Sequence, residues 1–153
     1  MFFNGEKEKI KEIISEFFKK GGFSVLIEVS ASEENVFQAR IKTDEPKILI
    51  GQNGQTLIEV QHLLRIIVKK SLKEEIQLDL DINDYKKKKF EYLKDIARTV
   101  ADEVFLSKKD KELEPMPSYE RRIIHMELAN RSDVLTESIG EGESRRIVVK
   151  SKQ

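Results

Sequence analysis

The chain has 153 residues, 39% of them hydrophobic and 37% charged, and its 28 basic and 28 acidic side chains cancel at neutral pH. This length suits one ordinary domain or two small ones. The absence of cysteine excludes disulfide bonds and cysteine-based zinc sites. The charge balance argues against a large, diffuse basic surface, so we expect any contact with nucleic acid to come from local clusters of charge.

No apolar run approaches the roughly 20 residues that a membrane-spanning helix needs. The first seven residues do not place a basic segment before an apolar core, so they do not resemble a secretory signal. We therefore expect no membrane insertion and no export signal at this end of the sequence.

Apolar periodicity predicts the elements of the first half of the chain. Residues 6–20 carry isoleucine and phenylalanine at helical spacing, and the two glycines that follow are typical of a helix end. Residues 23–30 and 36–43 alternate as strands do, and the polar turn between them predicts a hairpin. Pro46 then begins a short apolar turn that leads into a glycine-containing segment.

Residues 55–72 have the pattern of an amphipathic helix. The positions that we expect this helix to bury are Leu57, Val60, Leu63, Leu64, Ile67 and Val68. Residues 75–82 alternate cleanly and predict a strand. The expected order is therefore helix, strand, strand, short helix, loop, helix and strand.

A long helix is expected over residues 85–106, and a run of four lysines covers its first turn. Its expected buried positions are Phe90, Leu93, Ala97, Val100, Ala101, Val104 and Phe105. Residues 107–114 are charged and predict a loop, and Pro117 is suited to opening the next helix. The expected apolar contacts of that helix are Ile123, Ile124, Met126 and Leu128. Strands at 134–139 and 145–151 then flank a Gly-Glu-Gly-Glu turn.

Together these elements predict an α+β protein of two modules, residues 1–83 and residues 84–153. In the first module, Gly51, Gln52, Asn53 and Gly54 connect two expected helices. Glycine lets a backbone approach a phosphate closely, and the first amides of the following helix can point at an anion. The alternative is that the two glycines serve only a tight turn between helices.

This arrangement, with Gly-x-x-Gly between two helices of a three-stranded α+β unit, resembles a KH domain of the bacterial, type II, kind. In that family the loop holds about four nucleotides by their backbone, and the matching positions here are Gly51 to Gly54. Many loops of the family carry lysine or arginine at a middle position. Gln52 and Asn53 offer amide donors but no charge.

Arg121 and His125 are four residues apart on an expected helix, so they project from one helical face. An arginine there can hold a phosphate through two parallel hydrogen bonds, and the histidine can donate to a second phosphate or stack on a base. Arg122 is a further candidate, for which a salt bridge on the solvent face is an equal alternative. His125 could also pack beneath the hairpin that follows.

The wider segment is more specific than this pair alone. Residues 116–125, followed by Thr136, Ser138, the glycine turn and Arg145, resemble the small domain that is named for the Arg-three-His spacing and is associated with single-stranded nucleic acid. A KH module, a long helix with a basic start and this domain, in that order, resemble the bacterial Jag family (SpoIIIJ-associated, also called KhpB or EloR) over nearly the whole chain.

The resemblance implies a cytoplasmic bacterial RNA-binding protein with a regulatory role in RNA fate and in cell growth or envelope assembly. It implies single-stranded RNA as the ligand, single-stranded DNA as the alternative, and a small KH-domain protein or a second copy as a protein partner. Family members usually carry an additional N-terminal Jag domain and a linker, and we expect neither within these 153 residues. They tend to have arginines where this chain has Lys87 to Lys89, and lysine lacks the planar fork of arginine.

A rival interpretation is a protein-interaction adaptor that uses the KH module for dimerisation and has little affinity for RNA; the uncharged Gln52-Asn53 pair favours it. We expect no enzyme, with no catalytic residue, cofactor or metal, because two distant histidines and no phosphate-binding Gly-Lys loop offer little chemistry. Asp79, Asp81 and Asp84 are spaced as metal ligands could be, but Asp79 and Asp81 are the exposed alternation partners of a strand, so solvation is the simpler explanation.

Overall fold

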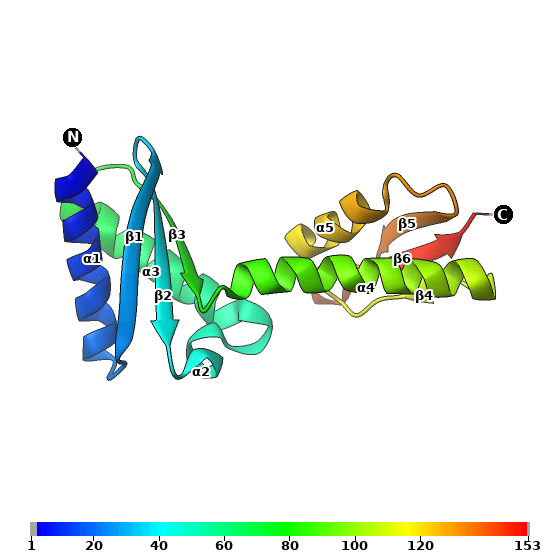
Figure 1. Cartoon of the computed structure of the whole chain (residues 1–153), viewed down its shortest axis with the longest axis horizontal. Coiled ribbons are helices and arrows are strands. Elements are labelled where there is room, and N and C mark those ends of the chain that lie inside the picture. Colours follow the sequence, from blue (N-terminus) through cyan, green and yellow to red (C-terminus); the bar gives the residue numbers. More distant parts are fainter. Residues whose placement is uncertain (1–2, 153) are drawn as a thin grey trace. The chain divides into compact units, whose positions relative to one another are not determined.

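The computed structural model describes residues 3–152, and the chain divides after Lys86 into two compact units (Figure 1). Each unit combines helices with a three-stranded sheet. The expected α+β class is therefore confirmed. Within the described residues no helix has the length and apolar character to cross a membrane.

The first unit has the expected order of helix, two strands, two helices and strand. Its elements are α1 (Phe3–Lys20), β1 (Val25–Glu33), β2 (Val36–Thr43), α2 (Pro46–Ile50), a 3-10 turn (Gln52–Gly54), α3 (Gln55–Leu72) and β3 (Gln77–Ile82). Strand β2 lies in the middle of the sheet, antiparallel to β1 and parallel to β3. This is the type II KH arrangement.

One face of this sheet packs on α1 and α3, and the alternation along the strands decides which side chains face them. On β1, Val25, Ile27 and Val29 pack against the core, while Leu26 is 72% exposed on the other face. The largest fully buried side chains of this unit are Ile10, Ile14, Phe18, Phe37, Ile41, Leu57, Leu64, Leu78, Leu80 and Ile82. This core fixes α3, and thereby the loop that precedes it.

The second unit is built on the long helix α4, whose first two residues belong to the first unit. Its elements are α4 (Tyr85–Ser107), β4 (Lys111–Glu112), α5 (Ser118–Leu128), β5 (Val134–Ile139), a 3-10 turn (Gly142–Ser144) and β6 (Arg146–Ser151). The strands lie in the order β4-β6-β5, and both pairings are antiparallel. The segment expected as a loop therefore contains the short edge strand β4, which pairs with Val148 and Val149.

Four apolar side chains that we expected to be buried are exposed. Phe90 and Phe105 are 41% and 44% exposed, and their rings lie under the ammonium groups of Lys94 and Lys108, at 4.9 and 4.2 Å. Both rings therefore meet a cation at the surface, which favours the ring face. The other two are Leu63, 46% exposed, and Met126, 65% exposed.

Met126 is exposed because it lies on the side of α5 that faces away from the core. The buried positions of α5 are Glu120, Ile124 and Leu128, which recur every four residues along one side. Met126 is two residues from Ile124, so it lies about 200° around the helix axis from it. An apolar residue therefore stands on the outer face of α5, where the core offers it no contact.

The lysine run at the start of α4 is only partly a solvated surface. The Lys86 ammonium donates to Gln61 Oε1 at 2.9 Å and pairs with Asp79 at 2.5 Å. Lys89 lies 3.8 Å from Glu120 Oε1, and its side chain is 20% exposed. Lys87 and Lys88 are exposed. Lys86 is therefore held by side chains of the first unit, and Lys89 by a side chain of the second.

Candidate nucleic-acid interface

The glycine loop has an unusual backbone. Gly51, Asn53 and Gly54 have φ values of 72°, 54° and 78°, in the left-handed region that glycine and asparagine tolerate best. The Gly51 amide donates to the Lys47 carbonyl at 3.0 Å, and the Gly54 amide donates to the Gly51 carbonyl at 3.4 Å. The turn thereby reverses the chain between α2 and α3.

Neither glycine of the loop can carry a side chain without displacing a neighbour. A Cβ atom on Gly51 would lie 2.1 Å from Thr56 Oγ1, and one on Gly54 would lie 2.9 Å from the Tyr85 ring. Real Cβ atoms do not approach other atoms this closely. The tight-turn explanation therefore accounts for both glycines by itself, and it is also compatible with a binding role for the loop.

The surface of the loop is polar and lacks charge. Gln52 and Asn53 are exposed, and no side chain caps the N-terminus of α3 after Gly54. The first amides of an uncapped helix favour an anion. Of the two nearby lysines named by the sequence, Lys69 is paired with Glu75. Lys47 is exposed and forms no ion pair within residues 3–152.

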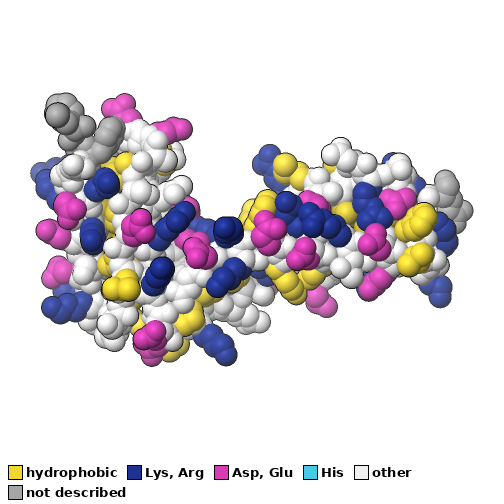
Figure 2. Space-filling view, in the orientation of Figure 1, with side chains coloured by type: hydrophobic (Ala, Val, Ile, Leu, Met, Phe, Trp, Pro, Cys, Tyr) yellow, Lys and Arg dark blue, Asp and Glu magenta, His cyan; other side chains and the backbone are white. Residues whose placement is uncertain are grey.

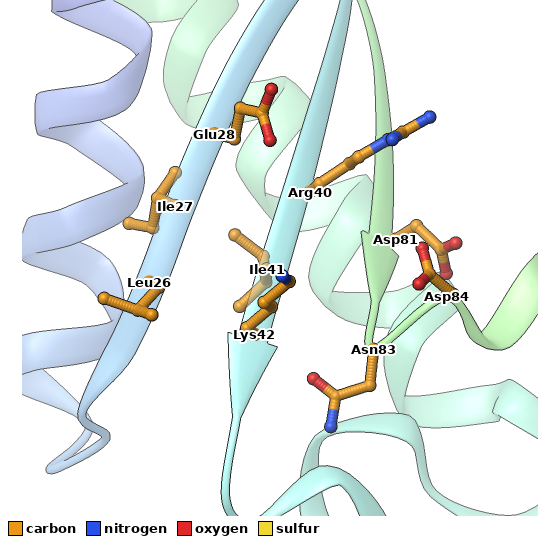
Figure 3. Close-up of a pocket in the computed structure, with 9 residues that line it drawn as sticks. All are labelled: Leu26, Ile27, Glu28, Arg40, Ile41, Lys42, Asp81, Asn83 and Asp84. Atoms are coloured by element: carbon orange, nitrogen blue, oxygen red, sulfur yellow. The ribbon is translucent and has the colours of Figure 1, made fainter.

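The uncovered face of the first sheet is a poor place for a polyanion. Figure 3 shows a hollow there, with the Arg40 side chain between Glu28 and the pair Asp81 and Asp84. Three carboxylates beside Arg40 and Lys42 would repel a phosphate backbone. The surfaces visible in Figure 2 likewise intersperse basic and acidic side chains, which are equal in number in this sequence.

In the second unit, helix α5 presents Arg121 and His125 to strand β5. The Arg121 guanidinium donates to the Met116 carbonyl at 3.2 Å and to Ser138 Oγ at 2.7 Å. His125 Nδ1 lies 2.6 Å from Thr136 Oγ1. The helical spacing of the arginine and the histidine matches the two-residue spacing of the hydroxyls, because Thr136 and Ser138 face the same side of β5.

Arg145, which precedes β6, joins this group: its Nε donates to Ser138 Oγ at 2.8 Å. Two guanidinium groups therefore share one hydroxyl oxygen. The sequence contains Arg145 as part of the wider motif, but its place beside Arg121 depends on the β5–β6 pairing of Ile139 with Arg146. The sequence signal that could have identified Arg145 is its position just after a hairpin turn, where the returning strand runs beside the strand that contacts the motif helix.

The arginines of the second unit fall into two groups. Arg98 pairs with Glu127, Arg131 with Asp133 and Asp102, and Arg146 with Glu112. Within residues 87–152, the arginines that have no carboxylate partner are Arg121, Arg122 and Arg145. Arg121 and Arg145 meet at Ser138 Oγ, so their charges form a local positive site, and Arg122 adds a third guanidinium group on the exposed surface of α5.

Burial, and to a lesser degree the charge of Arg121, lowers the pKa of His125. The imidazole is therefore neutral at neutral pH, and one of its two ring nitrogens donates. An anion bound beside it would favour the protonated form, because a nearby opposite charge raises the pKa of a base. The ring is only partly buried, so solvent or a ligand can reach it.

Comparison with known proteins adds independent findings. The family model of the Arg-three-His (R-three-H) domain matches residues 91–151. The RNA-binding protein KhpB of Clostridium symbiosum is 36% identical over 148 residues, which cover 96% of this chain and 67% of that protein. KhpB of Bacillus subtilis is 34% identical over 129 residues, covering 83% of this chain and 62% of its own length. KhpB of Lactiplantibacillus plantarum is 36% identical over 107 residues, 70% of this chain and 33% of its own length.

Proposed function

Because this chain belongs to the KhpB, or Jag, family of bacterial proteins, we propose that it binds single-stranded RNA through two sites. The relatives are named RNA-binding proteins, but this chain spans only part of their length. The first site is the loop from Gly51 to Gly54, in a KH module of residues 1–83. The second is the cluster of Arg121, Arg122, His125 and Arg145, in residues 84–153.

The observation that carries the proposal is the sharing of Ser138 Oγ by Arg121 and Arg145. Two guanidinium groups that donate to the same oxygen repel each other, and a hydroxyl oxygen carries no net charge to offset the repulsion. A phosphate oxygen would supply that charge and accept hydrogen bonds from both groups. Arginine–phosphate bonds of this kind are shorter and stronger than neutral ones.

At the loop, the ligand would be held mainly by main-chain amides and by the side-chain amides of Gln52 and Asn53. Such contacts recognise the sugar-phosphate backbone and not the base sequence. Single strands are the ligand that best fits this geometry, because a tight loop can follow one flexible backbone. The resulting function would be that of a cytoplasmic regulator acting on RNA.

Salt dependence of RNA binding tests the proposal. Binding of a labelled single-stranded RNA should weaken with salt, with a log–log slope that grows by about 0.7 for each neutralised phosphate. Arg121→Gln should weaken binding and reduce the slope by about that amount. Arg98→Gln removes a paired arginine from the same unit and should leave the slope unchanged. The same oligonucleotide as DNA would show which polymer is preferred.

A charge substitution tests the loop separately. Asn53→Asp should weaken binding about tenfold at low salt, because a carboxylate would face the bound phosphate. The matched control is Asn35→Asp, since Asn35 has a similar φ of 60° in a turn of the same unit. Wild-type protein that binds no RNA, or binds it equally at all salt concentrations, would refute the proposed function.

A second candidate function, a protein-interaction adaptor, is favoured by the exposed apolar side chains of α3. Ile58, Leu63 and Ile66 are 43%, 46% and 50% exposed. A second copy of the module or a small KH-domain protein could cover them. Leu63→Glu should then dissociate the complex in sedimentation, whereas Leu26→Glu, on the uncovered face of the sheet, should not. Association without any RNA binding would favour the adaptor over the RNA-binding function.

A further inference from the structure

The outer face of helix α5 carries three exposed side chains, away from its buried positions. Tyr119 is 47% exposed, Met126 is 65% exposed, and Arg122 is exposed and forms no hydrogen bond or ion pair within residues 3–152. They stand three and four residues apart, so their side chains are neighbours along one stripe of the helix. Arg121 and His125 project from a different side, toward β5.

The carboxylates of α5 are occupied elsewhere. Glu120 is 3% exposed; it accepts from the Tyr119 hydroxyl at 3.2 Å and lies 3.8 Å from the Lys89 ammonium. Glu127 is paired with Arg98 and Lys94. The outer stripe of α5 therefore has one guanidinium group and no competing acid from its own helix. Its net charge is positive, which suits an anionic polymer.

The three side chains share one chemical property. A tyrosine ring and an arginine guanidinium present flat, polarisable faces on which nucleobases stack. A methionine thioether is soft and adapts its shape to an aromatic neighbour. The Tyr119 hydroxyl hydrogen bond to Glu120 restrains the ring at the surface, so that less freedom is lost when a base covers it.

We propose that Tyr119, Arg122 and Met126 form a base-stacking platform for the nucleotide next to the one whose phosphate Arg121 and Arg145 hold. This inference rests on the proposed function and adds a base-recognition surface to the phosphate site. The positive charge of the stripe favours a nucleic acid over an uncharged apolar partner. Stacking is tolerant of base identity, because every base has a flat face.

A scan with abasic nucleotides tests the platform. An RNA with a single abasic position, moved stepwise along the strand, should bind wild-type protein about five- to tenfold more weakly at one position. Tyr119→Leu should weaken binding of intact RNA by a similar factor and remove the abasic effect at that position. The salt slope of Tyr119→Leu should equal that of the wild type, because no charge is lost.

Three control variants separate stacking from charge and from folding. Tyr119→Phe keeps the ring and loses only the hydroxyl, so it should bind nearly as the wild type does. Arg122→Lys keeps the charge and loses the planar face, so it should weaken binding without changing the salt slope. Leu135→Ala removes another half-exposed apolar side chain, on the opposite face of β5 from Thr136 and Ser138, and should have no effect.

The possible failures are distinguishable. Wild-type protein that binds no RNA overturns the proposed function and the platform together. Wild-type protein with a normal salt slope whose abasic profile is unchanged by Tyr119→Leu overturns the platform alone. A loss of binding in Tyr119→Phe equal to that in Tyr119→Leu would assign the effect to the hydrogen bond with Glu120, and would also overturn the platform.

Discussion

The glycine loop and the arginine cluster offer a phosphate two different kinds of partner. The loop presents main-chain amides in a conformation that Gly51 and Gly54 permit, and its middle residues carry no charge. The cluster presents guanidinium groups and one histidine, positioned by hydroxyls of β5. The first site therefore depends on backbone shape and the second on side-chain charge. Substitutions at the two sites should therefore differ in their effect on stability.

The difference follows from how each site is built. At the loop, packing against Thr56 and Tyr85 leaves no space for a Cβ atom, so the contacts that fold the turn also shape the site. At the cluster, Arg121 makes two hydrogen bonds within its unit, and its burial is intermediate. Substitution of a loop glycine should therefore reduce binding and stability together, whereas substitution of Arg121 should reduce binding alone.

The largest expected effect is on the stability of the first unit. Gly51→Ala should destabilise it by about 3 kcal/mol or more, because the new Cβ would meet Thr56 at 2.1 Å and alanine resists a φ of 72°. Gly142→Ala is the matched variant in the second unit: its φ is 56°, and nothing lies within 4 Å of the added Cβ. We expect the free energy of unfolding of the second unit to fall by about 1 kcal/mol in this variant.

Hydrogen exchange followed by mass spectrometry, with peptides assigned to each unit, measures the two losses separately. Arg121→Gln completes the comparison, because it should leave exchange in the first unit unchanged and still weaken RNA binding. Equal losses for Gly51→Ala and Gly142→Ala would mean that the loop tolerates a side chain. The backbone argument for this site would then be wrong.

The order of elements could be predicted because it depends on local patterns. Alternation on β1 and β3 and the periodicity of α3 identify the inward faces, and Gly21-Gly22 ends α1 as expected. Boundaries differed by two or three residues, since α1 begins at Phe3 and β1 extends to Glu33. Helix and strand ends depend on fraying and on pairing with other segments.

The sequence was less informative wherever a side chain's partner lies far along the chain. Lys89 pairs with a carboxylate 31 residues later, and Arg145 reaches Ser138 only because a hairpin brings them together. Exposure of Met126 depends on which side of α5 meets the sheet. Residue spacing could place Arg121 and His125 on a common helical face. It could not show which arginines would have no carboxylate as a salt-bridge partner.

A smaller effect, the change of RNA affinity with pH, should distinguish the arginine cluster from the glycine loop. The pKa of His125 is lowered below its ordinary value of 6.5 by burial and by Arg121. The unfolded chain therefore takes up a proton just below pH 6.5 while the folded protein stays neutral, and the stability of the second unit falls as the pH decreases through that range. A bound phosphate favours the protonated ring, so RNA affinity should rise as stability falls.

Between pH 7.5 and about 6, wild-type RNA affinity should increase about two- to fivefold. His125→Gln should abolish this increase, and Asn53→Asp should retain it, because the loop contains no group that titrates in this range. His62→Gln is the control, since His62 is the other histidine and is exposed on α3. A pH dependence that His62→Gln removes and His125→Gln preserves would exclude His125 from the ligand site.

The smallest expected effect concerns the acidic residues of the hairpin turn beside Arg145. Glu141 and Glu143 are exposed in this turn, which the Arg145 amide closes by donating to the Gly142 carbonyl. Their carboxylates should repel an approaching phosphate, but at physiological salt most of this repulsion is screened beyond about 8 Å. The double variant Glu141→Gln, Glu143→Gln should therefore bind RNA only about twofold more tightly, mainly through faster association.

The acidic turn of the first unit provides the control. Glu33→Gln with Glu34→Gln makes the same charge change at two exposed positions, the last residue of β1 and the residue that follows it. Stopped-flow association rates at low and high salt measure both variants. Equal acceleration by the two pairs would show that RNA responds to total charge and not to the arginine cluster, and it would weaken the distinction between a charged site and an uncharged one.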